Sequence, residues 1–241
     1  MKKIQKLLKK HKYICFLDFE GTQFSHEMIA WGATLATLDK NLKIKSHKKP
    51  FKVYVKAKNK IGHFVENLTG ITQRDLDRVG VPFAKAMKDL KKYCGHAFNK
   101  CSFMTFGNHD MKILSQSFAY NLDAPGEITS VIQKNFIDFQ AVISEFIKDD
   151  NNNPFSLENY LSLFGVEFKG KAHSPEYDAY NLMNLYNEFL NKKDIVLEEY
   201  LKVLTKVNHL PEPIKRSVAK LAKGEDVSGE EFKTFAEEYI K

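Results

Sequence analysis

The chain has 241 residues, of which 43% are hydrophobic and 28% charged, a composition that is ordinary for a globular protein with one substantial core and an appendage. Its formal net charge of +7, with a sequence pI near 9.0, favours a polyanionic partner. The sequence predicts no membrane-spanning segment, and three cysteines without Cys-x-x-Cys spacing indicate reduced thiols in a cytoplasmic protein.

The first predicted strand, residues 13–17, is apolar without alternation, which is typical of a strand buried on both faces. Asp18 and Glu20 follow it, and they project to the same side about 7 Å apart because side chains in a strand repeat every second residue. Two such anions need protons or cations, and a hard divalent metal meets that need with oxygen ligands. A solvated strand end is the alternative explanation of an isolated Asp-x-Glu pair.

Lysines are concentrated in residues 43–60, within which residues 51–56 alternate apolar and polar side chains as a half-exposed strand does. Edge strands carry lysines to prevent aggregation, whereas lysines also steer nucleic acids. The sequence leaves both roles open. Further along, Thr72 with Asp75 three residues later predicts a helix start, and Asp77 is expected on the surface of that helix.

Residues 101–106 predict a second apolar strand, a Gly-Asn turn follows, and apolar residues then recur at helical spacing from 111 to 118. Asp110 therefore opens a helix directly after a strand, where ligands gather in α/β proteins. Alone, Asp110 would be explained as the anion that complements the positive end of that helix. His109 is interpreted as a loop histidine. Asp138, which follows another apolar stretch, is expected at a surface or cap position.

Ser174 and Pro175 form a favourable helix start, with serine as N-cap and proline at the first helical position. His173 and Asp178 are five residues apart, so on one continuous helix they would point about 140° apart. If His173 instead lies on the loop before the cap, it can fold back over the first turn and converge with Asp178 on one substrate. An ordinary capped surface helix explains the same pattern.

Three segments describe the organisation: a basic N-terminal segment (1–9), an α/β domain (10–190) and a helical C-terminal extension (191–241). The extension begins with an amphipathic stretch, 194–207, and its last helix is expected to open at Ser228 with Glu231 as a capping box. The extension could pack on the domain, bind a partner or extend the substrate path.

Taken together and in this order, the motifs resemble the DEDDh family of 3′-to-5′ exonucleases. The resemblance is carried by DFEGT, GNHD and HSPEYDA, by the Leu-Thr-Gly-Ile loop in NLTGITQRDLD, and by SLENYLSLFGVEF ahead of the third motif. It covers roughly residues 10–190 and is closest to the Eri-like and KapD-like branch, several of whose members act on RNA. It implies an α/β, ribonuclease H-like three-layer fold, in which a mixed five-stranded sheet is flanked by helices.

The resemblance also implies roles for individual residues. Asp18, Glu20 and Asp178 would bind the first of two divalent ions, Mg²⁺ or Mn²⁺; Asp18 would bridge to the second ion, which Asp110 would support through water. His173 would be the general base, a task suited to imidazole because it exchanges a proton near neutral pH. The expected substrate contacts are Gly21 and Thr22 at the terminal sugar and Leu68, Thr69, Gly70 and Ile71 against the last base.

Three functions are compatible with these observations. The leading hypothesis is a 3′-to-5′ exonuclease that acts on single-stranded nucleic acid with a free 3′ end, slightly prefers RNA over DNA, and releases nucleoside 5′-monophosphates. A second is a DNA proofreading or repair exonuclease associated with a polymerase. A third is a non-catalytic nucleic-acid-binding or regulatory module, which the clustered anions disfavour because they repel phosphate.

Overall fold

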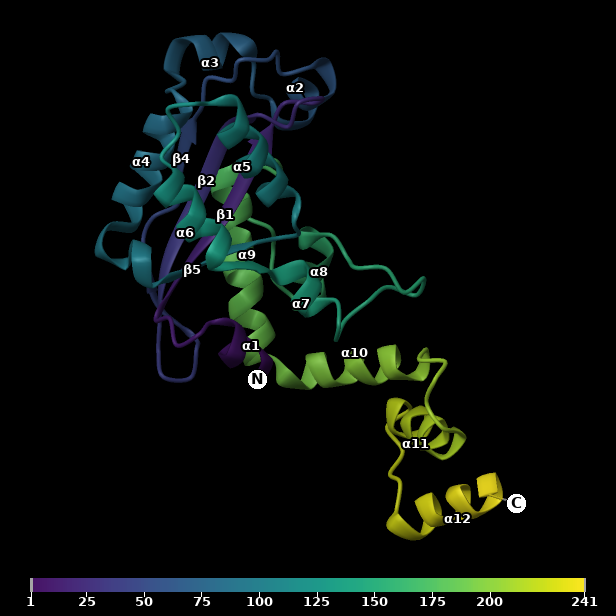
Figure 1. The fold of residues 1–241 in the computed structure, drawn as a ribbon. Coiled ribbons are helices and arrows are strands. Elements are labelled where there is room, and N and C mark those ends of the chain that lie inside the picture. Colours follow the sequence, from purple (N-terminus) through teal and green to yellow (C-terminus); the bar gives the residue numbers. More distant parts are fainter. Residues whose placement is uncertain (1, 241) are drawn as a thin grey trace.

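A mixed six-stranded sheet lies at the centre of residues 2–240, the part of the chain that the computed structural model describes (Figure 1). The strands are β1 (Tyr13–Gly21), β2 (Met28–Leu38), β3 (Ile44–His47), β4 (Phe51–Tyr54), β5 (Cys101–Thr105) and β6 (Phe136–Asp138). Their order is β3-β2-β1-β5-β6, with β4 also paired to β2. β2 is antiparallel to β1, β3 and β4, whereas β5 is parallel to its two neighbours, β1 and β6.

The sheet has six strands where five were predicted, because two short strands share one edge. β3 pairs with residues 36–38 of the long strand β2, and β4 pairs with residues 30–33 of the same strand. Between them lies Pro50, which has no N–H to donate to a ladder and so interrupts the pairing. The predicted edge strand over 51–56 is therefore present but ends at Tyr54.

Helices cover both faces of the sheet, as the three-layer prediction requires (Figure 1). They are α1 (Lys2–Leu7), α2 (His63–Thr69), α3 (Gln73–Val79), α4 (Phe83–Cys94), α5 (His109–Tyr120), α6 (Gly126–Lys134), α7 (Phe139–Ile143), α8 (Leu157–Leu163) and α9 (Pro175–Asn191), with a 3₁₀ helix at Gly95–Lys100. α1, α7, α8 and α9 bury one face, and α4, α5 and α6 bury the other. Each layer thus has its own hydrophobic core.

The central strand β1 contributes to both cores. Ile14 and Phe16 pack in the core under α9, while Cys15, Leu17 and Phe19 pack in the core under α4 and α5. This confirms the prediction of a strand buried on both faces. Because side chains alternate along a strand, the positions that follow Ile14 and Phe16 on the α9 side are 18 and 20. The alternation therefore directs both predicted carboxylates toward the N-terminus of α9.

The N-terminal segment is amphipathic rather than a free basic tail. Ile4 of α1 and Leu8 are both 1% exposed and belong to the core under α9. Their lysine neighbours remain at the surface; Lys3, for example, pairs with Glu145. The three cysteines are buried and form no disulfide.

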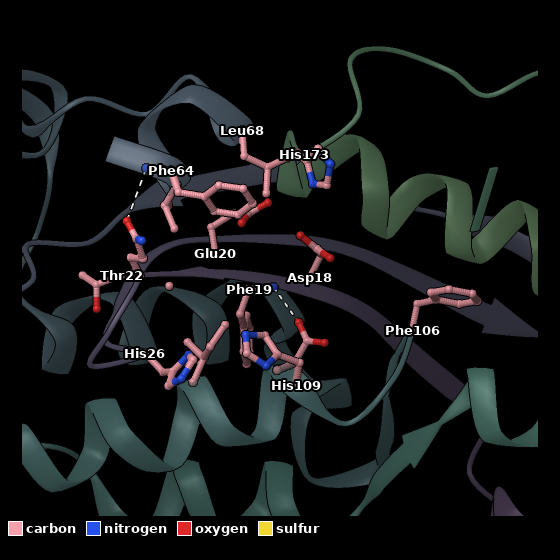
Figure 2. Close-up of a pocket in the computed structure, with 15 residues that line it drawn as sticks. Asp18, Phe19, Glu20, Thr22, His26, Phe64, Leu68, Phe106, His109 and His173 are labelled. Atoms are coloured by element: carbon pink, nitrogen blue, oxygen red, sulfur yellow. Dashed lines mark hydrogen bonds between the residues drawn. The ribbon is translucent and has the colours of Figure 1, made fainter. Parts of the chain in front are cut away.

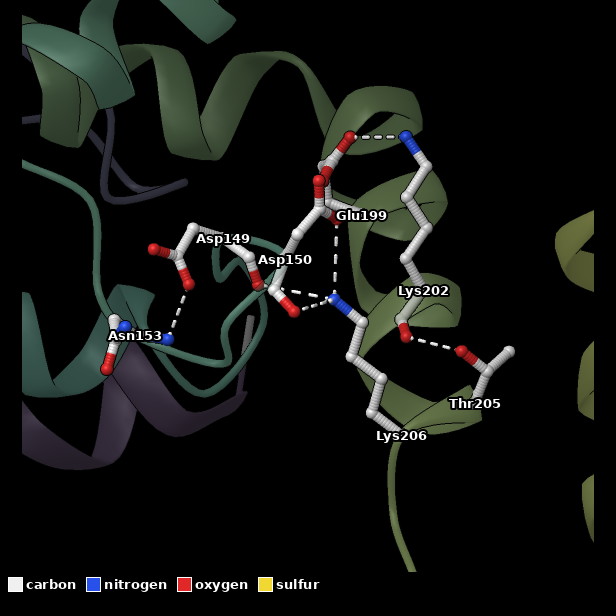
Figure 3. A network of polar contacts seen from close by, with 7 residues as sticks. All are labelled: Asp149, Asp150, Asn153, Glu199, Lys202, Thr205 and Lys206. Carbon is white, nitrogen blue, oxygen red and sulfur yellow. Dashed lines mark hydrogen bonds and ion pairs between the residues drawn. The ribbon is translucent and has the colours of Figure 1, made fainter.

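The C-terminal extension consists of α10 (Lys193–Thr205), α11 (Glu212–Ala222) and α12 (Gly229–Ile240), and it projects away from the domain (Figure 1). α10 is anchored to the domain: Val196 is buried, and Lys206 beyond its end donates to the carbonyls of Asp149 and Asp150 (Figure 3). The Ser228 hydroxyl accepts a hydrogen bond from the backbone of Glu231, as expected for a helix start. Within residues 2–240, none of the helices combines the length and the apolar character needed to cross a membrane.

Candidate active site

Three carboxylates converge where the end of β1 meets the start of α9. One side-chain oxygen from each of Asp18, Glu20 and Asp178 lies within 4.8 Å of the other two. Gly32 of β2, which pairs with Asp18, permits this approach because a Cβ there would lie 1.9 Å from the backbone of Pro175. The first turn of α9 therefore packs directly on the sheet, and Asp178 faces the carboxylates of β1.

His173 lies on a turn before α9, as predicted. Its φ is +61°, and the turn is closed by a 3.2 Å hydrogen bond from the Ser174 backbone N–H to the Lys171 carbonyl. The Ser174 carbonyl accepts from Asp178 N–H, so α9 begins immediately after the turn. Ser174 is the N-cap residue and Pro175 opens α9, as predicted, but the Ser174 hydroxyl donates to the Glu176 carboxylate instead of accepting from a backbone N–H of the first turn.

Asp110 approaches the same region from the other face of the sheet. It lies in the first turn of α5, is 6% exposed, and accepts a 2.7 Å hydrogen bond from the backbone N–H of Phe19. Since Phe19 stands between Asp18 and Glu20, this bond fixes α5 to the end of β1. Asp110 is not part of the three-carboxylate group, but it lines the adjoining cavity.

Two cavities, of about 370 and 300 Å³, meet at the carboxylates. Asp18, Glu20, Phe106 and His173 line both of them. In the first cavity, Phe64 and Leu68 lie on one side and His26 and His109 on the other, with Asp18 and Glu20 between (Figure 2). The second cavity is lined additionally by Asp178 and by residues of α8 and the loop before α9, namely Ser156, Leu157, Glu158, Phe168 and Ala172.

The predicted substrate-contacting residues are only partly at these cavities. Gly21, Thr22 and Leu68 line the first cavity. Thr69, Gly70 and Ile71 line neither cavity: Thr69 and Ile71 are 7% and 4% exposed, and the Thr69 hydroxyl accepts from Ile71 N–H. Phe64, Val65 and Leu68 of α2 line the first cavity, whereas Thr69, the last residue of the helix, is buried.

Several cavity residues were not predicted from the sequence. Phe64 is 63% exposed, and its backbone N–H donates to the side chain of Gln23, which also lines the cavity. Phe64 lies four residues before Leu68, and this helical spacing was the available signal. The buried Glu27 supports this wall, because its carboxylate accepts from the backbone N–H groups of Lys58 and Asn59 in the loop before α2.

Burial raises the pKa values of the four carboxyls, and neighbouring negative charges raise them further. Burial, followed by the charges of Asp110, Glu20 and Asp178, raises the pKa of Asp18 well above its usual range. Burial also raises the pKa of Glu20 to about 8 and those of Asp110 and Asp178 to about 7. Several half-buried or buried carboxylates, whose negative charge is disfavoured by burial and by their neighbours, fit a site for hard divalent cations.

We expect the metal-free protein to become less stable as the pH rises from about 5 to about 8. In that window the folded carboxyls, with raised pKa values, hold protons that the unfolded chain has lost, so deprotonation favours the unfolded state. Melting temperatures in a chelating buffer at constant ionic strength measure the slope. Glu20→Gln should flatten it, and a rising melting temperature over this window would contradict the account.

The model of the family described as Exonuclease (RNase_T) matches residues 15–186 of this chain. ERI1 exoribonuclease 2 of Xenopus laevis is 27% identical over 82% of this chain and 31% of its own length, and ERI1 exoribonuclease 2 of Danio rerio is 25% identical over 71% and 34%. The chain thus spans about a third of the length of these curated relatives.

Solved structures show the same fold. The nuclease domain of 3′hExo, a DEDDh family member bound to rAMP, has a TM-score of 0.59 at 24% identity, covering 76% of this chain and 93% of that one. E. coli Exonuclease I in complex with a dT13 oligonucleotide has a TM-score of 0.58 at 19% identity, covering 79% and 43%. Since the family model covers well over half of the residues, the chain belongs to the exonuclease (RNase_T) family.

Proposed function

We propose that this chain is a metal-dependent exonuclease that hydrolyses phosphodiester bonds from the 3′ end of single-stranded nucleic acid, with RNA slightly preferred over DNA, and releases nucleoside 5′-monophosphates. The observation that carries the proposal is the group formed by Asp18, Glu20 and Asp178, which lies beside His173 at the junction of two cavities. A scissile phosphate at that junction would have a nucleotide in each cavity.

Asp18, Glu20 and Asp178 would hold the first of two divalent ions, Mg²⁺ or Mn²⁺, and Asp18 would be shared with the second, which Asp110 would support through water. Bound there, the two ions would stabilise charge on the attacking and leaving oxygens. Asp110 also has a role in the protein itself, because its bond to Phe19 N–H holds the end of β1 in place.

His173 would take the proton from the attacking water. It is exposed on a turn at the edge of both cavities, so its ring can reach a water molecule beside the phosphate without blocking the substrate. The leaving 3′ oxygen of the preceding nucleotide would recover a proton from solvent. In this arrangement the carboxylates would hold the ions that stabilise charge, and the imidazole would transfer the proton.

The terminal nucleoside would occupy the first cavity, between the α2 side chains and the two histidines. Phe64 and Leu68 offer apolar surface on which a base can stack, and stacking is tolerant of sequence because every base has a π-face. The slight preference for RNA rests on the relatives, which include proteins called exoribonucleases and a nuclease domain bound to rAMP.

We expect Phe64→Ala to weaken binding of the terminal nucleotide by about 1–3 kcal/mol, seen mainly as a higher KM, because one stacking surface is lost. The measurement is steady-state digestion of a short single-stranded RNA. Phe232→Ala is the matched control, since Phe232 is an exposed phenylalanine on α12. An unchanged KM for Phe64→Ala would place the terminal base elsewhere.

The proposed function is tested by digesting RNA and DNA oligomers of equal sequence, labelled at the 5′ end, with Mg²⁺ or Mn²⁺. The expected result is a ladder that shortens from the 3′ end, faster for RNA, with 5′-monophosphate products and inhibition by a 3′-terminal phosphate. A strong preference for DNA would favour the proofreading or repair role. Cleavage of a circular single strand would exclude an exonuclease, and binding without hydrolysis would indicate a non-catalytic module.

A further inference from the structure

Three polar contacts connect the edge strand β4 to the turn that carries His173. The Lys52 ammonium lies 2.8 Å from one Glu176 oxygen and 3.3 Å from the Ser174 hydroxyl, which in turn donates to the other Glu176 oxygen at 3.0 Å. The side chains of Lys52 and Glu176 are only 23% and 18% exposed, so this ion pair is better shielded than a surface pair. Each of the three side chains, Lys52, Ser174 and Glu176, thus contacts the other two.

The turn is exposed between two anchors. At its start, the buried Asn181 side chain accepts from the backbone N–H of Lys169 and donates to the carbonyl of the same residue. At its end, Ser174 is held by Lys52 and Glu176. Between the anchors, residues 170–173 are all exposed.

The conformation of His173 requires such support. Its φ of +61° lies in the left-handed region, which costs a non-glycine residue about 1–3 kcal/mol and persists only where the surroundings enforce it. The adjacent Ser174 hydroxyl does not cap α9, although serine is a preferred N-cap residue. Its bond is directed to Glu176 instead, so the sequence uses this serine to fix the turn rather than to stabilise the helix end.

We propose that Lys52 is a positioning residue for His173, acting through Glu176 and Ser174. This inference rests on the proposed function, in which His173 takes the proton from water. It also assigns a role within the lysine-rich segment 43–60: Lys52 is a fixed internal contact and not a free charge that steers nucleic acid. Misplacing a general base by a fraction of its hydrogen-bond length slows the chemical step without weakening substrate binding.

The test compares Lys52→Met with Lys45→Met, since methionine keeps an unbranched stem and Lys45 is an exposed lysine on the neighbouring edge strand. Lys52→Met should lower kcat by about 10- to 100-fold with KM unchanged, and Lys52→Arg should recover much of the loss because it keeps the charge. In a His173→Ala background, Lys52→Met should cause no further loss. Unchanged kcat, or an equal fold-loss with and without His173, would overturn the inference.

A second readout does not depend on activity. The Cε1–Hε1 NMR signal of His173, identified by its disappearance in His173→Ala, should move in Lys52→Met and stay in place in Lys45→Met. A signal that stays in place in both would refute the positioning role. If the wild-type protein hydrolyses no substrate but the signal moves as expected, the exonuclease proposal fails while the coupling between Lys52 and His173 stands.

Discussion

Asp18→Asn is expected to abolish hydrolysis while raising the melting temperature of the metal-free protein. Asparagine is nearly isosteric with aspartate, but it removes the negative charge of the one carboxylate assigned to both ions. Losing several kcal/mol of charge stabilisation in the transition state corresponds to a rate loss of about 10³-fold or more. The same substitution should stabilise the metal-free protein, because burial and four neighbouring carboxylates disfavour the Asp18 anion.

The two effects are measured separately, by single-turnover digestion with Mn²⁺ and by thermal unfolding in a chelating buffer near pH 8, the upper end of the window in which the folded carboxyls lose protons. Asp77→Asn is the control, since Asp77 is exposed on α3 and accepts only from the Gln73 side chain. Near-normal rates for Asp18→Asn would exclude the assigned ligand role. A lower melting temperature would show that the Asp18 charge is better compensated than its neighbours suggest.

The fold was predictable because its signals are local. The apolar run before Asp18 predicted a strand buried on both faces, and Ile14, Cys15 and Phe16 contribute to opposite cores. The number of strands was not predictable, since whether one lysine-rich edge forms one strand or two depends on how β2 pairs along its length. The capping box of Thr72 and Asp75 is confirmed, because it involves only neighbouring residues.

The site was predictable in its acidic part and less so in its walls. Asp18, Glu20 and Asp178 converge as the order of the motifs implied. Of the Leu-Thr-Gly-Ile loop, Leu68 lines the first cavity, whereas Thr69 and Ile71 are buried at the end of α2, a distinction that depends on where the helix stops. Lys52 could not be identified at all, since its contacts with Ser174 and Glu176 span more than 120 residues of sequence.

His173→Ala should slow hydrolysis by about 10²- to 10⁴-fold, the range that a general base contributes. Divalent-ion binding should be retained, because His173 is outside the group formed by Asp18, Glu20 and Asp178. The melting temperature should change little, since the side chain is exposed and alanine leaves the contacts of Ser174 in place. The variant therefore separates the chemical step from metal binding and from folding.

The measurement pairs kcat at saturating Mg²⁺ with calorimetric titration of Mn²⁺, and His209→Ala, an exposed histidine beyond α10, is the control. Retained ion affinity with a reduced kcat supports proton transfer by His173. Loss of ion affinity would instead make His173 a ligand, and the turn that Lys52 supports would then shape the metal site. Loss of a general base should lower kcat alone, because the base acts in the chemical step. Loss of a metal ligand at the edge of both cavities should also change KM, because the bound ion contacts the substrate.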